Sequence, residues 1–360
     1  MTASHSPVLS TLATSSDGPV QLAQLTSEVG LSCQVCNYGA AIHELRTPDR
    51  AGKLDNIVLG YSSLDGYKTD PFFIGATVGR VANRLDHGRF ELGGTNYQLD
   101  CNNPPHHLHG GQDGWFKRVW TMSPLTSQPG SGVLLSLDSP DGDAGYPGRV
   151  QAQVSYLLQG NELHVVMTAT TDAPTLVNLA HHSYFNLAGQ GDVLGHQLKL
   201  NADHYTPGDP VPTGAVLPVE GTCFDFRSTQ TVGGQLPSEP APAPGFDLNY
   251  LLRTSGQVFT SNAQASQSRL CEQVTLAAQL SEPTTGRSLE LFTNQPGLQF
   301  YTGNYLDGRA GSSQALERYS GLCLETQAVP NFINIPDFAK QGLLAPGWTY
   351  RHEMLFRFSA

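Results

Sequence analysis

The sequence is built from short strand-like runs separated by turn clusters, and this pattern constrains the fold more than any other feature. About fourteen runs either alternate apolar and polar residues or are apolar throughout, and clusters rich in Gly, Pro, Asn and Asp lie between them. Windows with the 3.6-residue period of an amphipathic helix are nearly absent, so strands do not alternate with helices as a parallel α/β sheet requires. The pattern predicts an all-β fold, a large antiparallel sandwich or barrel.

Composition supports this prediction and excludes several classes of partner. Charged residues make up only 14% of the chain, which contains 38 Gly and 24 Pro, as is typical of many turns and few surface helices. With 20 Lys+Arg against 31 Asp+Glu the net charge is −11. A chain of this charge has no basic surface to neutralise phosphates, so neither nucleic acid nor an anionic membrane is an expected partner. A neutral small molecule remains the expected ligand.

Targeting signals and domain boundaries are weak in this sequence. No run approaches the ~18 consecutive apolar residues of a membrane helix, and the first residues lack a basic segment followed by an apolar one. Six cysteines are widely scattered, which favours reduced thiols and a cytoplasmic protein. The one break in composition is the Pro- and Ala-rich segment 231–245, which we expect to be a surface loop within a single domain spanning 1–360.

Four segments concentrate polar and ionisable residues inside strand-like surroundings: 75–84, 106–111, 178–186 and 322–327. In the last of these, LCLETQ, the two-residue period of a strand places Cys323, Glu325 and Gln327 on one face. A carboxylate in a mostly apolar strand is costly unless it is paired or used. Such a position also raises its pKa toward the working range of a general base. The sequence therefore points to Glu325 as the strongest catalytic candidate.

The other three segments allow both structural and functional interpretations. Period two would place His182, Tyr184 and Asn186 on one face of a strand, facing either solvent or a ligand. Arg80 and Arg84 are either surface cations or ligand-binding groups, and the histidines at 106, 107 and 109 form either a solvated turn or part of a site.

A metal site is a weaker alternative for the segment 106–111. His107-x-His109 followed by Asp113 loosely resembles the ligand set of metal-binding β-barrels, but no later histidine in a matching context completes it, so we expect no metal. Motifs for acyl, phosphoryl and hydride transfer are also absent.

Taken together, the segments resemble the aldose 1-epimerase (galactose mutarotase) family. The matching pieces occur in the same order along nearly the whole chain: NYGAAIHELRTPDRAGKLDNIVLGYSSLDGY, GATVGRVANRL, HLHGG, HHSYFNLAG, LKLNADHYTPGDPVPTGAVLPVEGTCFDFR, GFDLNYLL, PGLQFYTGNYLDG and GLCLETQAVPNFINIPDF. The resemblance implies a large antiparallel β-sandwich of the galactose mutarotase type. It also implies interconversion of the α and β anomers of free aldohexoses such as galactose and glucose, with neither cofactor nor metal.

The resemblance also assigns roles to individual residues. Glu325 matches the general base that takes the proton from the C1 hydroxyl, and His182 matches the general acid that protonates the ring oxygen. His109 matches a second histidine near the ring oxygen. The residues matched to the binding of sugar hydroxyls are Arg84, Asp247 and Gln299, with Asn83 as a weaker candidate beside Arg84. A carboxylate opposite an imidazolium suits a reaction that moves one proton off an oxygen and another onto one.

Two positions depart from the family pattern, because His181 stands where Asn is common and Leu248 stands where His is common. Both adjoin expected contact residues, so they put the sugar preference and the pH profile in question more than the reaction. Two alternatives remain: a non-catalytic sugar-binding or sensor protein on the same fold, and a hexose-6-phosphate epimerase, which would need more basic residues near the cleft. The sequence leaves open both the preferred aldose and the choice between monomer and dimer.

Overall fold

The computed structural model describes residues 6–126, 128–208, 211–237, 244–253, 259–261 and 274–360. Its strands form three large sheets and several two-stranded ones, and every ladder between them is antiparallel. The predicted all-β class is therefore confirmed. The one α-helix among the described residues is α1 (Leu64–Lys68).

The largest sheet has ten strands in the order β11-β12-β13-β14-β31-β25-β24-β18-β21, with β23 also paired to β31. Their bounds are β11 (Thr121–Pro124), β12 (Ser131–Ser139), β13 (Val150–Gln159), β14 (Glu162–Thr171), β18 (Gln197–Leu200), β21 (Gln230–Thr231), β23 (Phe259–Ser261), β24 (Thr275–Ser281), β25 (Ser288–Thr293) and β31 (Trp348–Ser359).

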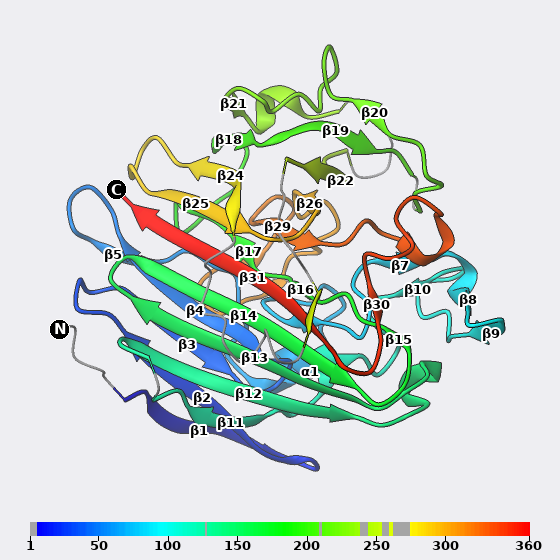
Figure 1. The fold of residues 1–360 in the computed structure, drawn as a ribbon. Coiled ribbons are helices and arrows are strands. Elements are labelled where there is room, and N and C mark those ends of the chain that lie inside the picture. Colours follow the sequence, from blue (N-terminus) through cyan, green and yellow to red (C-terminus); the bar gives the residue numbers. More distant parts are fainter. Residues whose placement is uncertain (1–5, 127, 209–210, 238–243, 254–258, 262–273) are drawn as a thin grey trace.

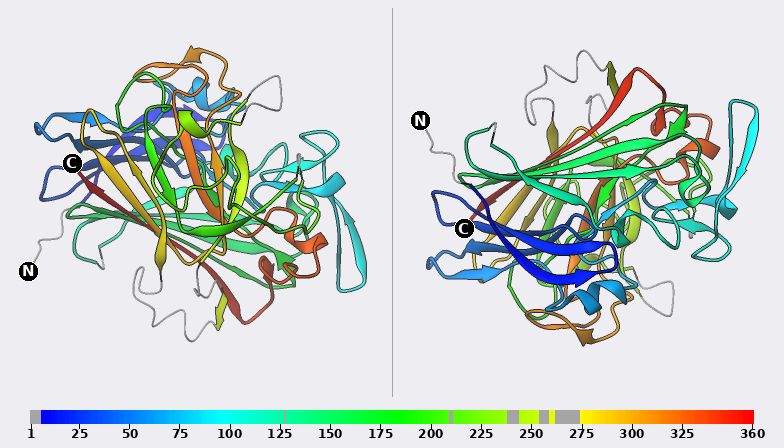
Figure 2. Two further views of the ribbon diagram at one scale, coloured as in Figure 1. Left: turned by 90° about the horizontal axis from the view of Figure 1, so that it is seen from above. Right: turned by 90° about the horizontal axis from the view of Figure 1, so that it is seen from below.

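Two further sheets pack against it. The five-stranded sheet runs in chain order through β1 (Val8–Ser15), β2 (Gly18–Thr26), β3 (Ser32–Cys36), β4 (Ala41–Pro48) and β5 (Leu54–Asn56). The six-stranded sheet has the order β17 (Tyr184–Phe185), β29 (Leu322–Gln327), β26 (Gly297–Tyr301), β22 (Asp247–Leu252), β19 (Ala202–Thr206) and β20 (Leu217–Pro218). In Figure 1 the blue five-stranded sheet lies behind the green and red strands of the ten-stranded sheet, and Figure 2 shows the two as separate layers.

Short elements connect and flank these sheets. The two-stranded sheets pair β7 (Arg84–Leu85) with β10 (His107–Leu108), β6 (Thr77–Val78) with β16 (Ala180–His181), β8 (Arg89–Leu92) with β9 (Thr95–Gln98), β15 (Thr175–Leu176) with β30 (Leu343–Leu344) and β27 (Arg309–Ala310) with β28 (Ala315–Leu316). The 3-10 turns are η1 (Asp86–Gly88), η2 (Trp115–Lys117), η3 (Asp143–Gly145), η4 (Gly233–Gln235) and η5 (Phe332–Asn334).

Alternation of side chains explains why the long strands form. In β13, Val150, Ala152 and Val154 are buried while the intervening Gln151 and Gln153 are exposed. Successive side chains of a strand point to opposite faces, so this pattern buries one face of the sheet and hydrates the other.

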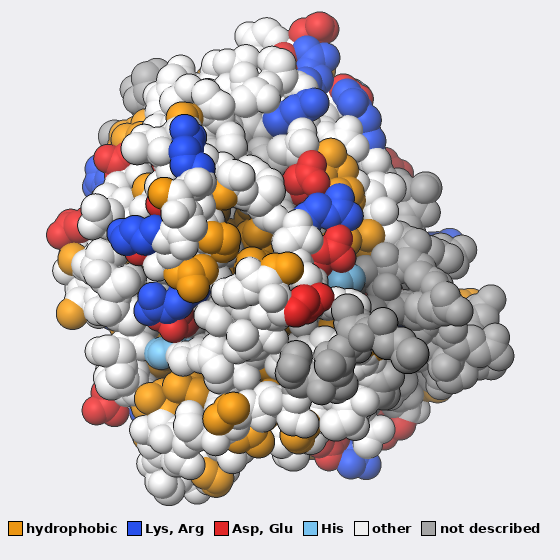
Figure 3. Space-filling model, turned by 90° about the vertical axis from the view of Figure 1, so that its left-hand side faces the viewer, with side chains coloured by type: hydrophobic (Ala, Val, Ile, Leu, Met, Phe, Trp, Pro, Cys, Tyr) orange, Lys and Arg blue, Asp and Glu red, His pale blue; other side chains and the backbone are white. Residues whose placement is uncertain are grey.

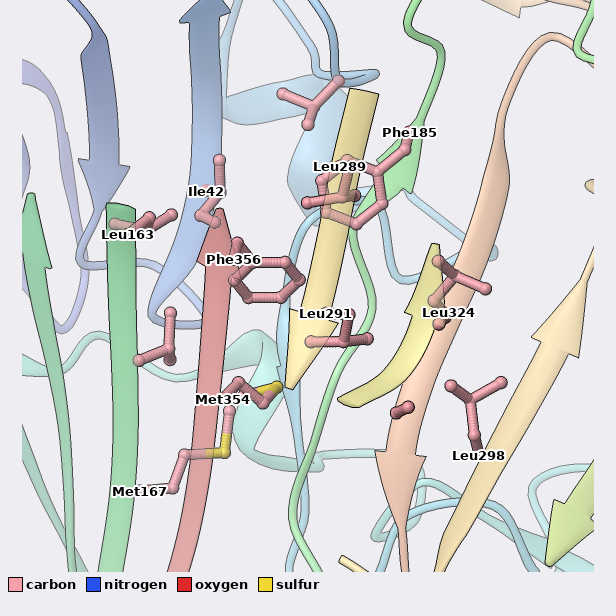
Figure 4. Packing of buried hydrophobic residues seen from close by; sticks show 14 of the residues in the cluster. Ile42, Leu163, Met167, Phe185, Leu289, Leu291, Leu298, Leu324, Met354 and Phe356 are labelled. Carbon is pink, nitrogen blue, oxygen red and sulfur yellow. The ribbon is translucent and has the colours of Figure 1, made fainter. Parts of the chain in front are cut away.

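One apolar cluster joins the three sheets. It contains Ile42 from the five-stranded sheet, Leu163 and Phe356 from the ten-stranded sheet, and Leu298 and Leu324 from the six-stranded sheet. Figure 4 shows these side chains converging between β4, β14, β31, β26 and β29. Because the inner face of the six-stranded sheet is buried in this cluster, polar residues of its strands are left to the opposite face.

The predicted surface loop and one of the cysteines lie partly or wholly outside the described residues. The predicted loop 231–245 begins with the end of β21 and with η4, whereas 238–243 lie outside the described residues. Of the six cysteines, Cys271 also lies outside them, and the other five form no disulfide with one another.

None of the described helices is long and apolar enough to cross a bilayer. On the face shown in Figure 3, acidic and basic side chains are interspersed and do not gather into a patch of one sign.

Candidate active site

Three neighbouring strands of the six-stranded sheet form one wall of a polar cleft, which we call the strand wall. The ladders pair Glu325 on β29 with Gln299 on β26, and Asp247 on β22 with Tyr301 on β26. These registers place Glu325, Gln299 and Asp247 side by side on the face turned away from the core. The Gln299 Nε2 donates a hydrogen bond to Asp247 Oδ1 at 2.7 Å. The two-residue period of β29 accordingly places Glu325 on the face opposite Leu324, which belongs to the apolar cluster.

The opposite wall comes from chain segments outside the large sheets, and we call it the loop wall. Asn83 directly precedes β7, Arg84 begins it, and His109 directly follows β10, the strand that pairs with β7. Asn83 and His109 both have positive φ values, 60° and 53°. They are held together because the Asn83 amide donates to His109 Nδ1 at 3.1 Å and the His109 amide donates to the Asn83 carbonyl at 3.0 Å. The Arg84 Nε donates to Asn103 Oδ1 at 2.9 Å, which fixes the guanidinium beside the cleft.

His182 belongs to the loop wall and lies between two very short strands. The expectation of one continuous strand through 182, 184 and 186 is wrong, because β16 ends at His181 and β17 begins at Tyr184. The backbone of His182 pairs instead with the loop at 75–76: its amide donates to the Ala76 carbonyl at 2.8 Å, and its carbonyl accepts from the Gly75 amide at 3.0 Å. This exchange turns the imidazole across the cleft toward the strand wall.

The two walls meet around a cavity of about 190 Å³. All seven residues expected to form the site line it: Asn83, Arg84, His109, His182, Asp247, Gln299 and Glu325. The Nε2 of His182 lies 3.5 Å from Oε1 of Glu325, and both side chains are buried. Within the part of the chain that the structure describes, Glu325 Oε2 and Gln299 Oε1 have no hydrogen-bond partner. Buried polar atoms are normally satisfied, so these two are available to a ligand.

Burial shifts the proton affinities of the facing pair in opposite directions. It raises the pKa of Glu325 well above its ordinary value, as does the negative charge of Asp247, whereas Arg84 opposes the shift. It lowers the pKa of His182 to about 4. Since burial disfavours the charged form of each group, the carboxyl and the imidazole compete for one proton. Such a pair can accept a proton at one position and donate one at the other.

His109 differs from His182 in its protonation. Its pKa is held well below the ordinary value, mainly by burial and further by His182. Because its Nδ1 accepts the Asn83 amide hydrogen, the single proton of the neutral ring lies on Nε2. His109 is therefore fixed as a hydrogen-bond donor.

Sequence reasoning missed the aromatic part of the loop wall. Phe73 lines the cavity, and its ring centroid lies 4.5 Å from that of His109 and 5.7 Å from that of His182. Its φ of 59° is held by Asp70, whose carboxylate accepts the amides of Phe72 and Ile74. The available signal was the pair of phenylalanines after Asp-Pro and before Gly75, which alternation alone does not distinguish from core residues.

Several polar residues singled out in the sequence lie outside the site. The guanidinium of Arg80 is buried and donates to the carbonyl oxygens of Pro147 and Gly148 and to Ser139 Oγ. The ring nitrogens of His107 contact the Asp100 carbonyl and the Tyr146 hydroxyl. Both residues stabilise the structure. Because the ring of His107 is held in these contacts, His107 and His109 do not combine with Asp113 as a metal site would require.

The two departures from the family pattern lie outside the 190 Å³ cavity, and Leu248 lines an adjoining cavity that shares Asp247 and Gln299 with the site. The Nε2 of His181 lies 3.1 Å from the Tyr156 hydroxyl in the interior, and Leu248 packs against the main apolar cluster. Neither residue lines the 190 Å³ cavity.

The fold and the site define a class of protein: an antiparallel β-sandwich with a buried carboxylate–imidazole pair in a cleft for a small polar ligand. The sequence profile of the family described as "Aldose 1-epimerase" matches residues 21–357. The galactose mutarotase of Mus musculus is 42% identical over 351 residues, covering 96% of both chains. The aldose 1-epimerase of Escherichia coli K12 is 32% identical over 352 residues, covering 95% of this chain and 96% of its own.

Solved structures agree with the sequence relatives. The galactose 1-epimerase of Lactobacillus acidophilus superposes with a TM-score of 0.82 at 27% identity, covering 98% of each chain. The chain belongs to the aldose 1-epimerase family.

Proposed function

We propose that this protein is an aldose 1-epimerase that interconverts the α and β anomers of free aldohexoses, with galactose and glucose as the first candidates. The observation that carries the proposal is the buried pair formed by Glu325 and His182, whose side chains face each other at 3.5 Å across a polar cavity. The named relatives, aligned over nearly the full chain, support the same reaction.

The reaction opens and closes the sugar ring through two proton transfers. With the pair in its ionic form, the Glu325 carboxylate takes the proton of the C1 hydroxyl while His182 Nε2 donates a proton to the ring oxygen O5. The electron pair of the O1–H bond forms the C1 carbonyl, and the C1–O5 bond breaks. Glu325 then holds the proton and His182 is neutral, which is the form that burial favours. After the aldehyde end rotates about the C1–C2 bond, the reverse transfers close the ring on the other face.

The remaining residues bind and orient the sugar. Arg84 and His109 Nε2 supply hydrogen-bond donors, and Asp247 supplies an acceptor. The Gln299 Nε2 is engaged by Asp247, which leaves its Oε1 for a sugar hydroxyl. Phe73 contributes an apolar surface beside the two histidines. These groups all belong to the protein, so the proposed chemistry uses neither metal nor cofactor.

Polarimetry tests the proposal directly. Freshly dissolved α-D-galactose and α-D-glucose should reach their equilibrium rotation faster with catalytic amounts of the protein than without it. A non-catalytic sugar-binding protein would bind these sugars and leave the decay unchanged. A hexose-6-phosphate epimerase would act on glucose 6-phosphate and not on glucose. Arg84 is the only Lys or Arg among the described residues that line the cavity, which does not favour a phosphorylated substrate.

The structure also supports proposals on the domain organisation and the cellular compartment. We propose a single domain, because the main apolar cluster draws on strands from Ala23 through Phe358. We also propose a cytoplasmic protein, since the buried thiol of Cys323 contacts His182 of the site.

A further inference from the structure

The two histidines of the site differ in what their Nδ1 atoms contact. The Nδ1 of His109 accepts a backbone amide hydrogen, so it carries no proton. The Nδ1 of His182 faces the sulfur of Cys323 at 3.5 Å, on the side of the ring away from Glu325. Among neutral imidazoles, the contact made by one nitrogen decides which nitrogen holds the proton. Cys323 is therefore placed to determine the protonation of His182, and the function proposed above leaves Cys323 without a role.

The surroundings of Cys323 favour its sulfur as a hydrogen-bond acceptor toward His182. Burial raises the pKa of its thiol well above the ordinary value, so the sulfur keeps its hydrogen. Tyr184 is the ladder partner of Cys323 across β17 and β29, and its side chain also acts on the thiol. The Tyr184 hydroxyl donates its own hydrogen to the Phe72 carbonyl at 2.9 Å, which leaves its lone pairs for the thiol hydrogen. The lone pairs of the sulfur are then directed at His182 Nδ1 as a weak acceptor.

We propose that Cys323 is a positioning residue that accepts a hydrogen bond from Nδ1–H of His182 and thereby leaves Nε2 as the nitrogen that exchanges a proton with the sugar. In this arrangement His182 Nδ1–H donates to Cys323 Sγ, while the nearby Tyr184 hydroxyl donates to the Phe72 carbonyl. The proposal rests on the proposed function only in naming the sugar as the partner of Nε2.

The choice of sulfur has a chemical consequence. During ring opening and closure His182 alternates between an imidazolium and a neutral ring, and Nδ1 must stay protonated in both if Nε2 is the shuttling atom. A carboxylate at this place would hold the imidazolium strongly and weaken it as an acid. A thiol is a weak acceptor, so it fixes the tautomer and the ring orientation with little gain in proton affinity.

The test compares two substitutions of the same residue. In Cys323→Ala the buried Nδ1–H loses its acceptor, and we expect kcat to fall roughly tenfold or more with little change in KM. In Cys323→Ser an oxygen acceptor remains, and kcat should stay within about threefold of the wild-type value, since one neutral hydrogen bond is exchanged for another. A thiol that only fills space predicts the opposite order, because a buried hydroxyl is costlier than a methyl group.

Cys33 supplies a matched control, since it is equally buried but lies in the main apolar cluster. Cys33→Ala and Cys33→Ser should lower stability without changing kcat.

The pH profile adds a second readout. The groups facing His182 are Glu325 and Cys323 from β29, Tyr184 from β17, Phe73 and His109 from the loop wall, and Arg84 and Asp247 farther across the cleft. Cys323→Ala should move the acid limb of kcat/KM to lower pH, whereas Cys323→Ser should not.

Nitrogen-15 NMR of histidine-labelled wild-type protein shows which ring nitrogen of His182 carries the proton, without any variant of Cys323. The Nδ1 of His182, assigned by comparison with His182→Asn, should show the shift of a protonated ring nitrogen near pH 7, and the Nδ1 of His109 that of an unprotonated one. An unprotonated Nδ1 in His182, or a kcat for Cys323→Ala equal to or above that of Cys323→Ser, would overturn the proposal. Because this spectrum does not depend on turnover, it is distinct from a failure of the proposed reaction, which polarimetry of the wild-type protein would reveal.

Discussion

The two walls of the cleft are built in different ways. On the strand wall, Glu325, Gln299 and Asp247 occupy matched positions of paired strands, so a regular ladder fixes their spacing. On the loop wall, Asn83 and His109 have positive φ values and depend on hydrogen bonds between segments far apart in the sequence. The strand wall supplies the proposed base and the loop wall the proposed acid. The side chains of the strand wall are therefore positioned by strand register, and those of the loop wall by a network of hydrogen bonds.

The largest expected effects come from removing one member of the proton-transfer pair, with one member on each wall. Glu325→Gln and His182→Asn should each lower kcat by roughly 10² to 10⁴-fold, the usual contribution of one proton-transfer group, with much smaller effects on KM. Polarimetry or exchange NMR measures this. Glu91→Gln and His204→Asn change exposed residues outside the cavity and should leave the rate unchanged.

The same measurement shows whether both walls take part in proton transfer. A near wild-type kcat in Glu325→Gln would mean that the strand wall only binds the sugar and that the base lies elsewhere.

A smaller loss is expected from Arg84, the cation of the loop wall. Arg84→Ala should raise KM and lower kcat, for a combined loss of about 10 to 100-fold in kcat/KM, because hydrogen bonds from a charged donor contribute about 1.5–3 kcal/mol. Initial-rate kinetics over a range of galactose concentrations separate the two constants. The exposed Arg89→Ala is the control. A change confined to kcat would assign Arg84 to the transition state alone.

Phe73 tests the network that positions the loop wall. Phe73→Ala removes the ring packed against His109 and His182, and we expect kcat/KM to fall by about 3 to 10-fold, the size of an aromatic contact of 0.5–1.5 kcal/mol. Phe73→Leu should fall less, since it keeps part of the apolar surface. If both variants match the wild type, the ring positions neither histidine nor sugar.

The two walls also differ in how far the sequence predicts them. Strand period placed Glu325 on the strand face opposite Leu324, and alternation predicted the all-β class, because both follow from a local two-residue repeat. Period failed at His182, whose direction depends on backbone pairing with Gly75 and Ala76 about a hundred positions earlier. The same limit explains Arg80, whose neighbours Pro147 and Ser139 are remote in sequence. Local pattern left His109 as either a turn residue or a site residue, and the family resemblance supplied its role and those of Asp247 and Gln299.

The smallest expected effect is that of chelation. Exhaustive treatment with EDTA should leave the rate of mutarotation unchanged, because both proton transfers are assigned to side chains. This is a sharp test, since His109, His182 and Glu325 offer ligand atoms within 4.8 Å of one another. Activity that is lost with chelation and restored by Zn²⁺ or Mn²⁺ would replace the acid–base pair with a metal centre.

The double variant Glu325→Gln/His182→Asn tests most directly the claim that the two walls act together on the protons of one sugar. Groups that act as a unit are strongly non-additive, so the double variant should lose little more kcat than the worse of the two single variants. The measurement is the polarimetric rate for α-D-galactose with all three variants and the wild-type protein at one pH. A loss equal to the product of the two single losses would show that Glu325 and His182 act independently, and it would contradict the account.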